Sequence, residues 1–352
     1  MRTLLVAVAL FTAPATASEG PPFREDFDPD EALGLMREYE VPGLAYARIE
    51  DCRDSDTAYL GVRDKETGRP VDRKTVFELA SPTKSVFSVM VMTLAEEGIV
   101  DLDRPLALDR DEPRIKEQED YRVLTPRMVL SHRTGLPNWA DDVDNKAVLD
   151  APLPFLSPPG ESFTYSGEAY GLLQHTVEAI IDAPTETLFE RTLAEIMPHS
   201  SFEKVKPGTH AATGYFEIQG KEVSLPAEET PAVRVAGGLL TTAEDVAAFV
   251  GMICQREGLS EESYDTLFEN YSPREISAED RAEGVLSRGY GLGFALEETV
   301  RGSLIYHNGN NGNFQTLYLL DPDRRTGVVY LTNSQNGLSV IDRLISLPAA
   351  ED

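Results

Sequence analysis

The order of the secondary-structure patterns along the chain constrains the fold more than any other feature of the sequence. Strand-like segments come first and return last, and amphipathic helical segments lie between them. The strands are predicted at 42–50, 57–62, 75–79, 290–296, 304–308, 315–320 and 327–333. Strands at both ends of a chain favour one sheet to which both ends contribute. We therefore predict an α+β fold, an α/β sandwich whose antiparallel sheet is packed with helices, plus an inserted all-helical lobe.

Turn and cap residues support this arrangement in detail. A polar turn at 51–56 is predicted between the first two strands, and a polar turn at 321–326 links the last two as an antiparallel hairpin. Thr125 and Thr242 each precede a helical pattern and are predicted to cap it. The length of 352 residues favours two lobes. We assign residues 18–352 to a single domain with an α/β lobe at 30–80 and 228–352 and a helical lobe at 81–227.

Residues 1–17 have the three parts of a secretory signal. Arg2 supplies the positive charge, residues 4–11 form the apolar core, and residues 15–17 give a small-residue cleavage site. The apolar core is too short to span a bilayer, and no later stretch approaches that length. We therefore expect export to the periplasm or to the outside of the cell, without a membrane span.

The charge of the chain limits its partners. The formal net charge is −28, from 60 acidic and 32 basic residues, whereas nucleic-acid binding requires a basic footprint. Nucleic acid is therefore excluded, and the acidic residues are interpreted as a solvated surface. The five histidines show no metal-binding spacing, so we expect no metal.

The two cysteines, Cys52 and Cys254, leave two alternatives open. An exported protein can keep a disulfide, and an even number of cysteines permits one. Two cysteines are not a disulfide framework, so both can equally be reduced and buried.

Ser81 and Lys84 stand at the head of a run that stays apolar to Leu94. On a helix their spacing of three places both side chains on one face. Pro82 suits the first helical position, and the absence of a continuous polar face predicts a buried helix. A desolvated lysine has a lowered pKa and, when neutral, can take the proton of a serine hydroxyl. This pair is the candidate nucleophile and base.

The same spacing recurs at Ser201 and Lys204, which shows how weak it is alone. That second pair lies between Pro198 and Pro207 with no buried helical run after it, so we interpret it as a loop. Placement at the head of a buried helix is what distinguishes Ser81.

Two later segments supply further candidates. Tyr165 lies in a predicted turn just before a helix, where a phenol beside a protonated lysine is stabilised as phenolate and can pass a proton. Residues 306–314 are polar and rich in glycine and asparagine at the end of a predicted strand. Glycine there lets a ligand approach the backbone, and a free N–H can hold an oxyanion. Taken singly, a buried tyrosine or a lone histidine such as His307 is usually structural.

Six segments together resemble the serine β-lactamase and penicillin-binding-protein superfamily, specifically its class C-like branch of β-lactamases, D,D-peptidases and esterases. The resemblance runs from about residue 42 to 333, and the Ser-x-x-Lys element is one of its catalytic motifs. The segments are 78–85, 124–137, 165–173, 236–239, 290–294 and 307–309. The resemblance implies a β-lactamase/transpeptidase-like fold.

The resemblance also implies a role for each matching residue. Ser81 would be the acylated nucleophile, Lys84 its activating partner and Tyr165 the proton shuttle. His307 and Gly309 would stand where the family has Lys-Thr-Gly or His-x-Gly at the edge of the cleft. The backbone N–H groups of Ser81 and Asn310 would form the oxyanion hole.

Two departures from the family pattern bear on the substrate. Gly167 replaces the asparagine that binds the acylamino group of β-lactams and peptides, and His307 replaces a permanent cation. A neutral histidine still has a hydrogen bond to donate. Both changes favour an esterase or D-amino-acid peptidase over a β-lactamase.

The sequence therefore predicts an exported serine hydrolase that cleaves an ester or amide and needs no metal or organic cofactor. The alternative is a non-catalytic cell-wall-binding or sensing relative that uses the same cleft. A triad around His307 on an α/β-hydrolase fold lacks the required G-x-S-x-G elbow.

Overall fold

The computed structural model describes residues 20–139, 152–227 and 235–346. The predicted signal peptide, residues 1–17, lies outside the described residues. Within the described parts, no helix combines the length and apolar character needed to cross a bilayer.

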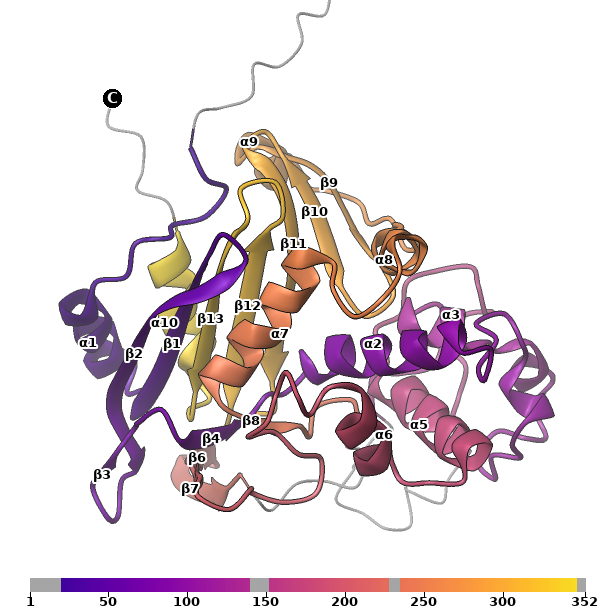
Figure 1. The fold of residues 1–352 in the computed structure, drawn as a ribbon, viewed down its shortest axis with the longest axis horizontal. Helices are drawn as coiled ribbons and strands as arrows, with labels where there is room; N and C mark the ends of the chain where they lie inside the picture. Colours follow the sequence, from indigo (N-terminus) through magenta and orange to yellow (C-terminus); the bar gives the residue numbers. More distant parts are fainter. Residues whose placement is uncertain (1–19, 140–151, 228–234, 347–352) are drawn as a thin grey trace, which may run out of the picture.

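Strands from both ends of the chain form one sheet (Figure 1). They are β1 (Gly43–Glu50), β2 (Arg53–Asp64), β3 (Arg69–Pro70), β9 (Val285–Tyr290), β10 (Ala295–Thr299), β11 (Gly302–Asn310), β12 (Gln315–Asp321) and β13 (Thr326–Thr332). The order across the sheet is β3-β2-β1-β13-β12-β11-β10-β9, and each pair is antiparallel. Both ends of the chain therefore contribute to one sheet, as predicted, and the first long strand pairs with the last.

The remaining elements lie around this sheet. The other strands are β4 (Thr75–Glu78), β5 (His210–Ala211), β6 (Thr213–Ile218), β7 (Lys221–Pro226) and β8 (Leu240–Thr241). The helices are α1 (Pro29–Glu38), α2 (Thr83–Glu96), α3 (Pro126–Leu130), α5 (Gly167–Ile181), α6 (Thr185–Thr192), α7 (Ala243–Gln255), α8 (Glu261–Phe268), α9 (Ala278–Ala282) and α10 (Gly337–Ile345), with short 3-10 turns η1 (Leu106–Leu108) and η2 (Glu119–Val123).

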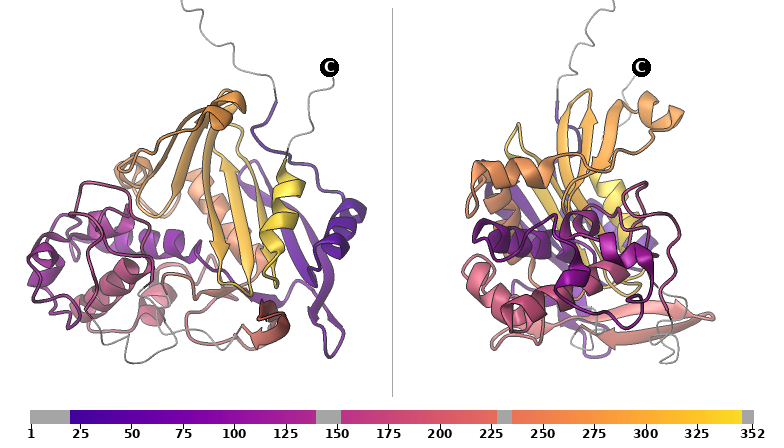
Figure 2. Two further views of the ribbon diagram at one scale, coloured as in Figure 1. Left: turned by 180° about the vertical axis from the view of Figure 1, so that it is seen from behind. Right: turned by 90° about the vertical axis from the view of Figure 1, so that its right-hand side faces the viewer.

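Helices cover both faces of the sheet, which explains its apolar strands. In β13, Val329 and Leu331 belong to the large core with α2 and α7, whereas Val328 and Tyr330 pack with α1 and α10. Successive residues of a strand point to opposite faces, so both faces must be apolar when both are covered. Figure 1 shows α7 across one face, and the reverse view in Figure 2 shows α10 on the other. The predicted α+β sandwich is confirmed.

Four local predictions can be compared with these elements. The hairpin of β12 and β13 turns at 321–326 as predicted. The side chains of Thr125 and Thr242 accept from backbone N–H groups as N-caps. The predicted polar turn at 51–56 is wrong, because Asp51 and Cys52, both at positive φ, make a two-residue turn and β2 begins at Arg53.

The predicted strand at 290–296 is also wrong. β9 ends at Tyr290 and β10 begins at Ala295, so the intervening residues reverse the chain. Leu292 and Phe294 are fully buried, and Gly293 has a φ of +88° where a Cβ would lie 2.0 Å from Ser88 Oγ. The apolar run is therefore a buried turn against α2, and apolar character alone did not distinguish it from a strand.

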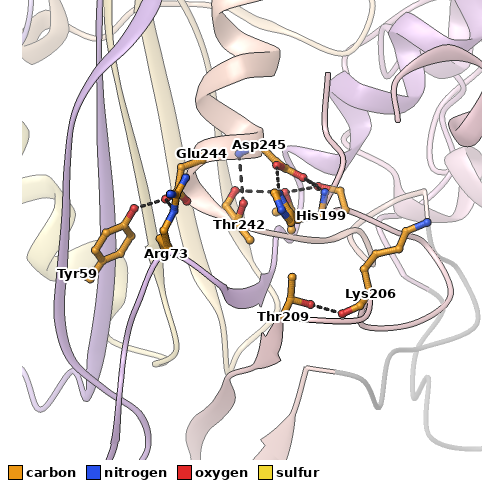
Figure 3. A network of polar contacts seen from close by, with 10 residues as sticks. Tyr59, Arg73, His199, Lys206, Thr209, Thr242, Glu244 and Asp245 are labelled. Carbon is orange, nitrogen blue, oxygen red and sulfur yellow. Dashed lines mark hydrogen bonds and ion pairs between the residues drawn. The ribbon is translucent and has the colours of Figure 1, made fainter. Parts of the chain in front are cut away.

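The stretch 81–227 is not all helical. Residues 213–226 form the β6–β7 hairpin, in which Gln219 and Gly220, both at positive φ, make the two-residue turn. That geometry is typical of a type I′ hairpin, but glutamine is an unusual first residue for it, so the turn was missed. Segment 199–209, which precedes the hairpin, is hydrogen-bonded to the first turn of α7 (Figure 3). There Asp245 accepts from His199 N at 2.7 Å, and its other carboxylate oxygen lies 3.1 Å from His199 Nδ1.

Cys52 and Cys254 form a disulfide, which decides between the two alternatives left open by the sequence. The bond joins the β1–β2 turn to the C-terminal end of α7. It therefore holds the most N-terminal part of the sheet against a helix that is 202 residues away in sequence.

Candidate active site

Ser81 lies in a tight turn between β4 and α2. Leu79 N donates to Leu239 O at 2.8 Å, and Ala80 then takes a left-handed φ of +55°, which is strained for a residue with a side chain. Helix α2 begins at Thr83, and Pro82 precedes it in helical conformation. Pro82 is therefore the N-cap, one position before the first helical residue, whereas the sequence predicted it at the first helical position. The turn presents the half-buried Ser81 at the head of a buried helix.

Lys84 meets Ser81 as the spacing predicts. Its Nζ lies 3.4 Å from Ser81 Oγ and donates to Ala236 O at 2.5 Å. The side chain is only 1% exposed, and burial lowers the pKa of Lys84 to about 7. A substantial fraction of the amine is therefore neutral near pH 7, with one N–H directed to a carbonyl and a lone pair left for the serine proton.

Tyr165 is the third side chain of the site, and its protonation state differs from the expectation. Lys84 Nζ lies over the phenol ring, 4.9 Å from its centroid. Burial raises the pKa of Tyr165, and the nearby Ser81 hydroxyl lowers it only in part, so the predicted phenolate is wrong. The Tyr165 hydroxyl is buried and completes no hydrogen bond of good geometry among the described residues. The site therefore pairs an amine that is partly neutral near pH 7 with a phenol that stays protonated.

His132 holds Tyr165 in place and was not identified as a site residue from the sequence. Its ring lies 4.1 Å from the Tyr165 ring, and its Nδ1 accepts from Ser166 N at 3.1 Å. Burial, together with Lys84 and His307, lowers the pKa of His132 well below its usual value. His132 follows α3 with a left-handed φ of +57°, a strained backbone conformation that places its ring against Tyr165. The sequence did contain a signal for this residue, because His132 lies in the 124–137 segment that carries part of the family resemblance.

His307 is neutral and fully engaged within the protein. Its Nδ1 donates to Asn308 O at 2.7 Å, and its Nε2 therefore accepts from Tyr290 Oη at 2.7 Å. Burial, mainly, and the nearby Lys84 lower the pKa of His307 to about 3. Neither ring nitrogen is left to donate to a substrate, contrary to the expectation. The residue orders β11 and adds no positive charge to the site.

Gly309 brings β11 against the serine turn. A Cβ at this position would lie 2.4 Å from Thr316 Oγ1, 2.7 Å from Pro82 Cδ and 2.8 Å from Ala80 Cβ. The absence of a side chain at Gly309 thus lets β11 approach the turn that carries Ser81. The sequence had predicted an approach of a ligand.

Asn310 turns its backbone N–H away from β12. Asn311 N donates to Phe314 O at 3.0 Å, so 311/314 is a hydrogen-bonded pair of the hairpin. Such pairs alternate along an antiparallel ladder, and the N–H of residue 310 therefore points to the other side. On that side the pairing of β11 with β10 ends at Tyr306. The Asn310 N–H is therefore directed to the edge of β11 that β10 leaves unpaired, next to Gly309, which contacts the turn that carries Ser81.

Glu78 and Asn311 hold this edge in place by hydrogen bonds, and neither was identified as a site residue from the sequence. Asn311 Nδ2 donates to Glu78 Oε2 at 2.7 Å and to Gly237 O at 3.0 Å. Glu78 is 2% exposed, and burial raises its pKa to about 7 against the lowering effect of Asn311. The signal was an acidic residue inside an otherwise apolar strand that leads to Ser81.

The comparison pair at Ser201 is structural. Ser201 is buried, its Oγ donates to Glu186 Oε1 at 2.7 Å, and Lys204 is exposed. Among residues 20–139, 152–227 and 235–346, no group of three or more His, Cys, Asp or Glu side chains is placed to hold a metal. The structure therefore brings together Ser81, Lys84 and Tyr165 and leaves Ser201 outside.

An antiparallel sheet between helices, with a serine and a buried lysine at the head of the central helix and a tyrosine beside them, is the arrangement of the serine β-lactamase and penicillin-binding-protein-like superfamily. The chain belongs to the Beta-lactamase family, whose family profile matches residues 30–347.

Relatives and solved structures agree with this assignment. "Protein flp" of Staphylococcus aureus (strain COL) is 21% identical over 319 residues, 85% of this chain, and this chain spans 61% of that relative's length. "Penicillin-binding protein 4*" of Bacillus subtilis (strain 168) is 24% identical over 337 residues, 87% of this chain and 70% of that protein.

Two solved structures share the fold. The octameric penicillin-binding protein homologue from Pyrococcus abyssi has a TM-score of 0.73 at 24% identity, over 88% of this chain and 74% of that one. The D-alanine carboxypeptidase AmpC from Burkholderia cenocepacia has a TM-score of 0.68 at 20% identity, over 90% of this chain and 97% of that one.

Proposed function

We propose that this protein is a serine hydrolase that cleaves an ester or amide through an acyl-enzyme on Ser81. The observation that carries the proposal is the 3.4 Å approach of Ser81 Oγ to Lys84 Nζ, an amine that burial keeps partly neutral. A base must be within reach of the proton that it removes and must be unprotonated at the working pH, and Lys84 meets both conditions.

Acylation then follows from the positions of the three side chains. Ser81 Oγ attacks the substrate carbonyl carbon, and its proton passes to Lys84 Nζ. The bond from that carbon to the leaving oxygen or nitrogen breaks, and the leaving group takes a proton from the phenol of Tyr165. Lys84 returns a proton to Tyr165, and water later releases the acyl group by the reverse path.

The oxyanion of each tetrahedral intermediate would be held by backbone donors. The N–H of Ser81 and the outward-facing N–H of Asn310 are the candidates. One such donor typically contributes about 3–4 kcal/mol to the stability of the transition state. Gly309 supports this arrangement because it lets β11 reach the serine turn.

The substrate is proposed from what the site lacks as well as from its relatives. A neutral His307 with both nitrogens engaged offers no cation for a substrate carboxylate, and Gly167 offers no side-chain amide. An ester therefore fits best, followed by a D-amino-acid peptide and a β-lactam. The named relatives support the peptide and β-lactam classes.

Export of the protein to the periplasm or beyond is part of the proposal. Residues 1–17 have the pattern of a secretory signal. The Cys52–Cys254 disulfide supports the same location, because such bonds persist in oxidising compartments.

Covalent labelling tests the nucleophile. A fluorophosphonate or fluorescent penicillin probe should label the wild type and Ser201→Ala, whereas Ser81→Ala should not be labelled. Turnover of a 4-nitrophenyl ester by Ser81→Ala should fall at least about a thousandfold. Equal labelling of the Ser81 and Ser201 variants would refute the proposal.

A non-catalytic binding role is the second candidate, and the neutral His307 and Gly167 favour it. A pre-steady-state burst of nitrophenol, equal to the enzyme concentration, would show acylation and exclude this role. Probe binding that is reversible and independent of Ser81 would favour it.

A further inference from the structure

Trp139 lies directly over Gly167, two residues beyond Tyr165. A Cβ added to Gly167 would lie 2.6 Å from Trp139 Cη2, 2.8 Å from Cζ2 and 2.9 Å from Cζ3. The indole therefore occupies the space that any side chain at 167 would need. Trp139 is 43% exposed, which is unusual for so large an apolar side chain.

The indole is on the same side of the chain as the catalytic phenol. Ser166 is extended, with φ −142° and ψ 113°, so the residues before and after it direct their side-chain bonds to the same side. The side chain of Tyr165 points to Lys84 and Ser81. The open position at Gly167, and the ring that fills it, therefore border the site next to Tyr165.

Hydrogen bonds fix the segment that carries Trp139. Gly167 N donates to Asn138 O and to Asn138 Oδ1, both at 3.0 Å, and Glu168 N donates to Asn138 O at 3.0 Å. Ser166 Oγ donates to Pro137 O at 2.7 Å. The segment thus takes up the first N–H groups of α5, which fixes the backbone that carries the indole.

We propose that Trp139 determines acyl-group specificity by forming an apolar aromatic wall that selects substrates with an aryl or arylalkyl acyl group. This inference rests on the proposed function. A flat ring gains both apolar burial and favourable ring–ring geometry against an indole. An acylamino group gains neither, and Gly167 has no side chain to bind it. Among the described residues 137–139, the side-chain amide is that of Asn138, whose Oδ1 already accepts from Gly167 N.

Esters that share one leaving group test the acyl side alone. Wild type should hydrolyse 4-nitrophenyl phenylacetate with a kcat/KM about tenfold above that for 4-nitrophenyl acetate. The 4-nitrophenyl ester of N-acetylglycine should be no better than the acetate. Trp139→Ala should reduce the phenylacetyl-to-acetyl ratio about tenfold, and Trp139→Phe should restore most of it.

Leu108→Ala is the matched control, because Leu108 is a large apolar side chain, 64% exposed, in the 3-10 turn η1. It should leave the ratio unchanged. A wild-type preference for N-acetylglycyl that is lost in Asn138→Ala would overturn the inference and assign the subsite to the Asn138 amide. A ratio unchanged by Trp139→Ala would also overturn it.

Fluorescence gives a second test that needs no turnover, because Trp139 is the only tryptophan of the chain. In Ser81→Ala, phenylacetate should shift or quench the tryptophan emission with saturation, whereas N-acetylglycine should not. If Ser81 is never acylated but phenylacetate still saturates this signal, the proposed function fails and the aromatic wall stands. If Ser81 is labelled but phenylacetate gives no saturable change, the wall fails and the hydrolase stands.

Discussion

At the scale of single residues, burial gives Lys84 its chemistry. An ammonium group loses hydration when it is buried, and the only strong partner of Lys84 in the described structure is a carbonyl, which does not restore the full charge stabilisation. The same burial acts in the opposite direction on Tyr165, since it disfavours the phenolate. The same desolvated pocket therefore lowers the pKa of the amine and raises the pKa of the phenol.

The pH dependence of activity should follow Lys84. The pKa of the amine is lowered from 10.5 to about 7, so kcat/KM should fall below pH 7 as the amine is protonated. Lys84→Arg keeps a positive charge but has no accessible neutral form, and it should lose about 10²–10⁴-fold in kcat. A pH–rate profile of ester hydrolysis checks this. A profile that is flat from pH 5 to 8 would exclude Lys84 as the base.

Tyr165→Phe should separate activity from stability. The hydroxyl is buried without a well-formed hydrogen bond, so its removal should leave the melting temperature unchanged or slightly higher. The rate should fall by about 10²–10⁴-fold because the proton donor is gone. Tyr170→Phe is the comparison: its hydroxyl donates to Leu130 O at 3.1 Å, and its loss should cost about 1 kcal/mol of stability. A Tyr165→Phe enzyme of normal rate would contradict the mechanism.

Glu78 should make stability fall as the pH rises from 4.5 to 7. Its pKa is raised to about 7 in the fold, so the folded state binds more protons than the unfolded state in this window. Glu78→Gln should remove about 2 kcal/mol of this pH dependence. Urea unfolding at pH 5 and pH 7.5 measures the difference, with the exposed Glu203→Gln as control. Parallel pH curves for wild type and Glu78→Gln would count against the assignment.

At the scale of elements, the site depends on how closely β11 approaches the turn between β4 and α2. Thr316 Oγ1 of the neighbouring strand β12 donates to Leu79 O at 2.6 Å. Gly309 packs so closely against Ala80 and Pro82 that no Cβ fits between them. The β11–β12 hairpin and the turn between β4 and α2, which are far apart in sequence, are thus held against each other next to Ser81.

Gly309→Ala should disrupt both stability and activity. Its Cβ would come within 2.4–2.8 Å of Thr316, Pro82 and Ala80, and overpacking of this kind costs about 1–3 kcal/mol. Because the strand must shift from the serine turn, kcat should fall by more than the loss of folded protein explains. Gly34→Ala, in α1 with no neighbour closer than 4.0 Å, should raise stability by up to about 1 kcal/mol. Thermal melting and ester kinetics on both variants distinguish the two cases.

At the scale of the whole molecule, the N-terminal and C-terminal strands are joined within the sheet by the pairing of β1 with β13, and the disulfide reinforces this part of the fold. The bond fixes the β1–β2 turn to α7 across a sequence separation of 202 residues. A bond that closes so long a loop removes conformational freedom from the unfolded chain and thereby stabilises the fold.

Removing the disulfide should destabilise the protein without changing its chemistry. Cys52→Ser with Cys254→Ser should lower the free energy of unfolding by about 2–5 kcal/mol. Urea unfolding of the wild type with and without reductant provides the same comparison on an unaltered sequence. Below the unfolding transition, ester hydrolysis should be unchanged, since Ser81 and Lys84 are far from the bond in the chain and belong to other elements. An unchanged unfolding midpoint would show that the bond adds nothing.

The sequence by itself determined the two-ended sheet, the caps at Thr125 and Thr242 and the serine–lysine pair, because each depends on local periodicity or on spacing along one helix. Tertiary structure alone decided that Tyr165 is a protonated phenol, that His307 is neutral and engaged, and that Trp139 covers Gly167. Those properties come from burial and from contacts between segments far apart in the chain. Local patterns carry no record of either, whereas His132 and Glu78 left a local signal, in the 124–137 segment and inside an apolar strand, whose meaning only their tertiary contacts make clear.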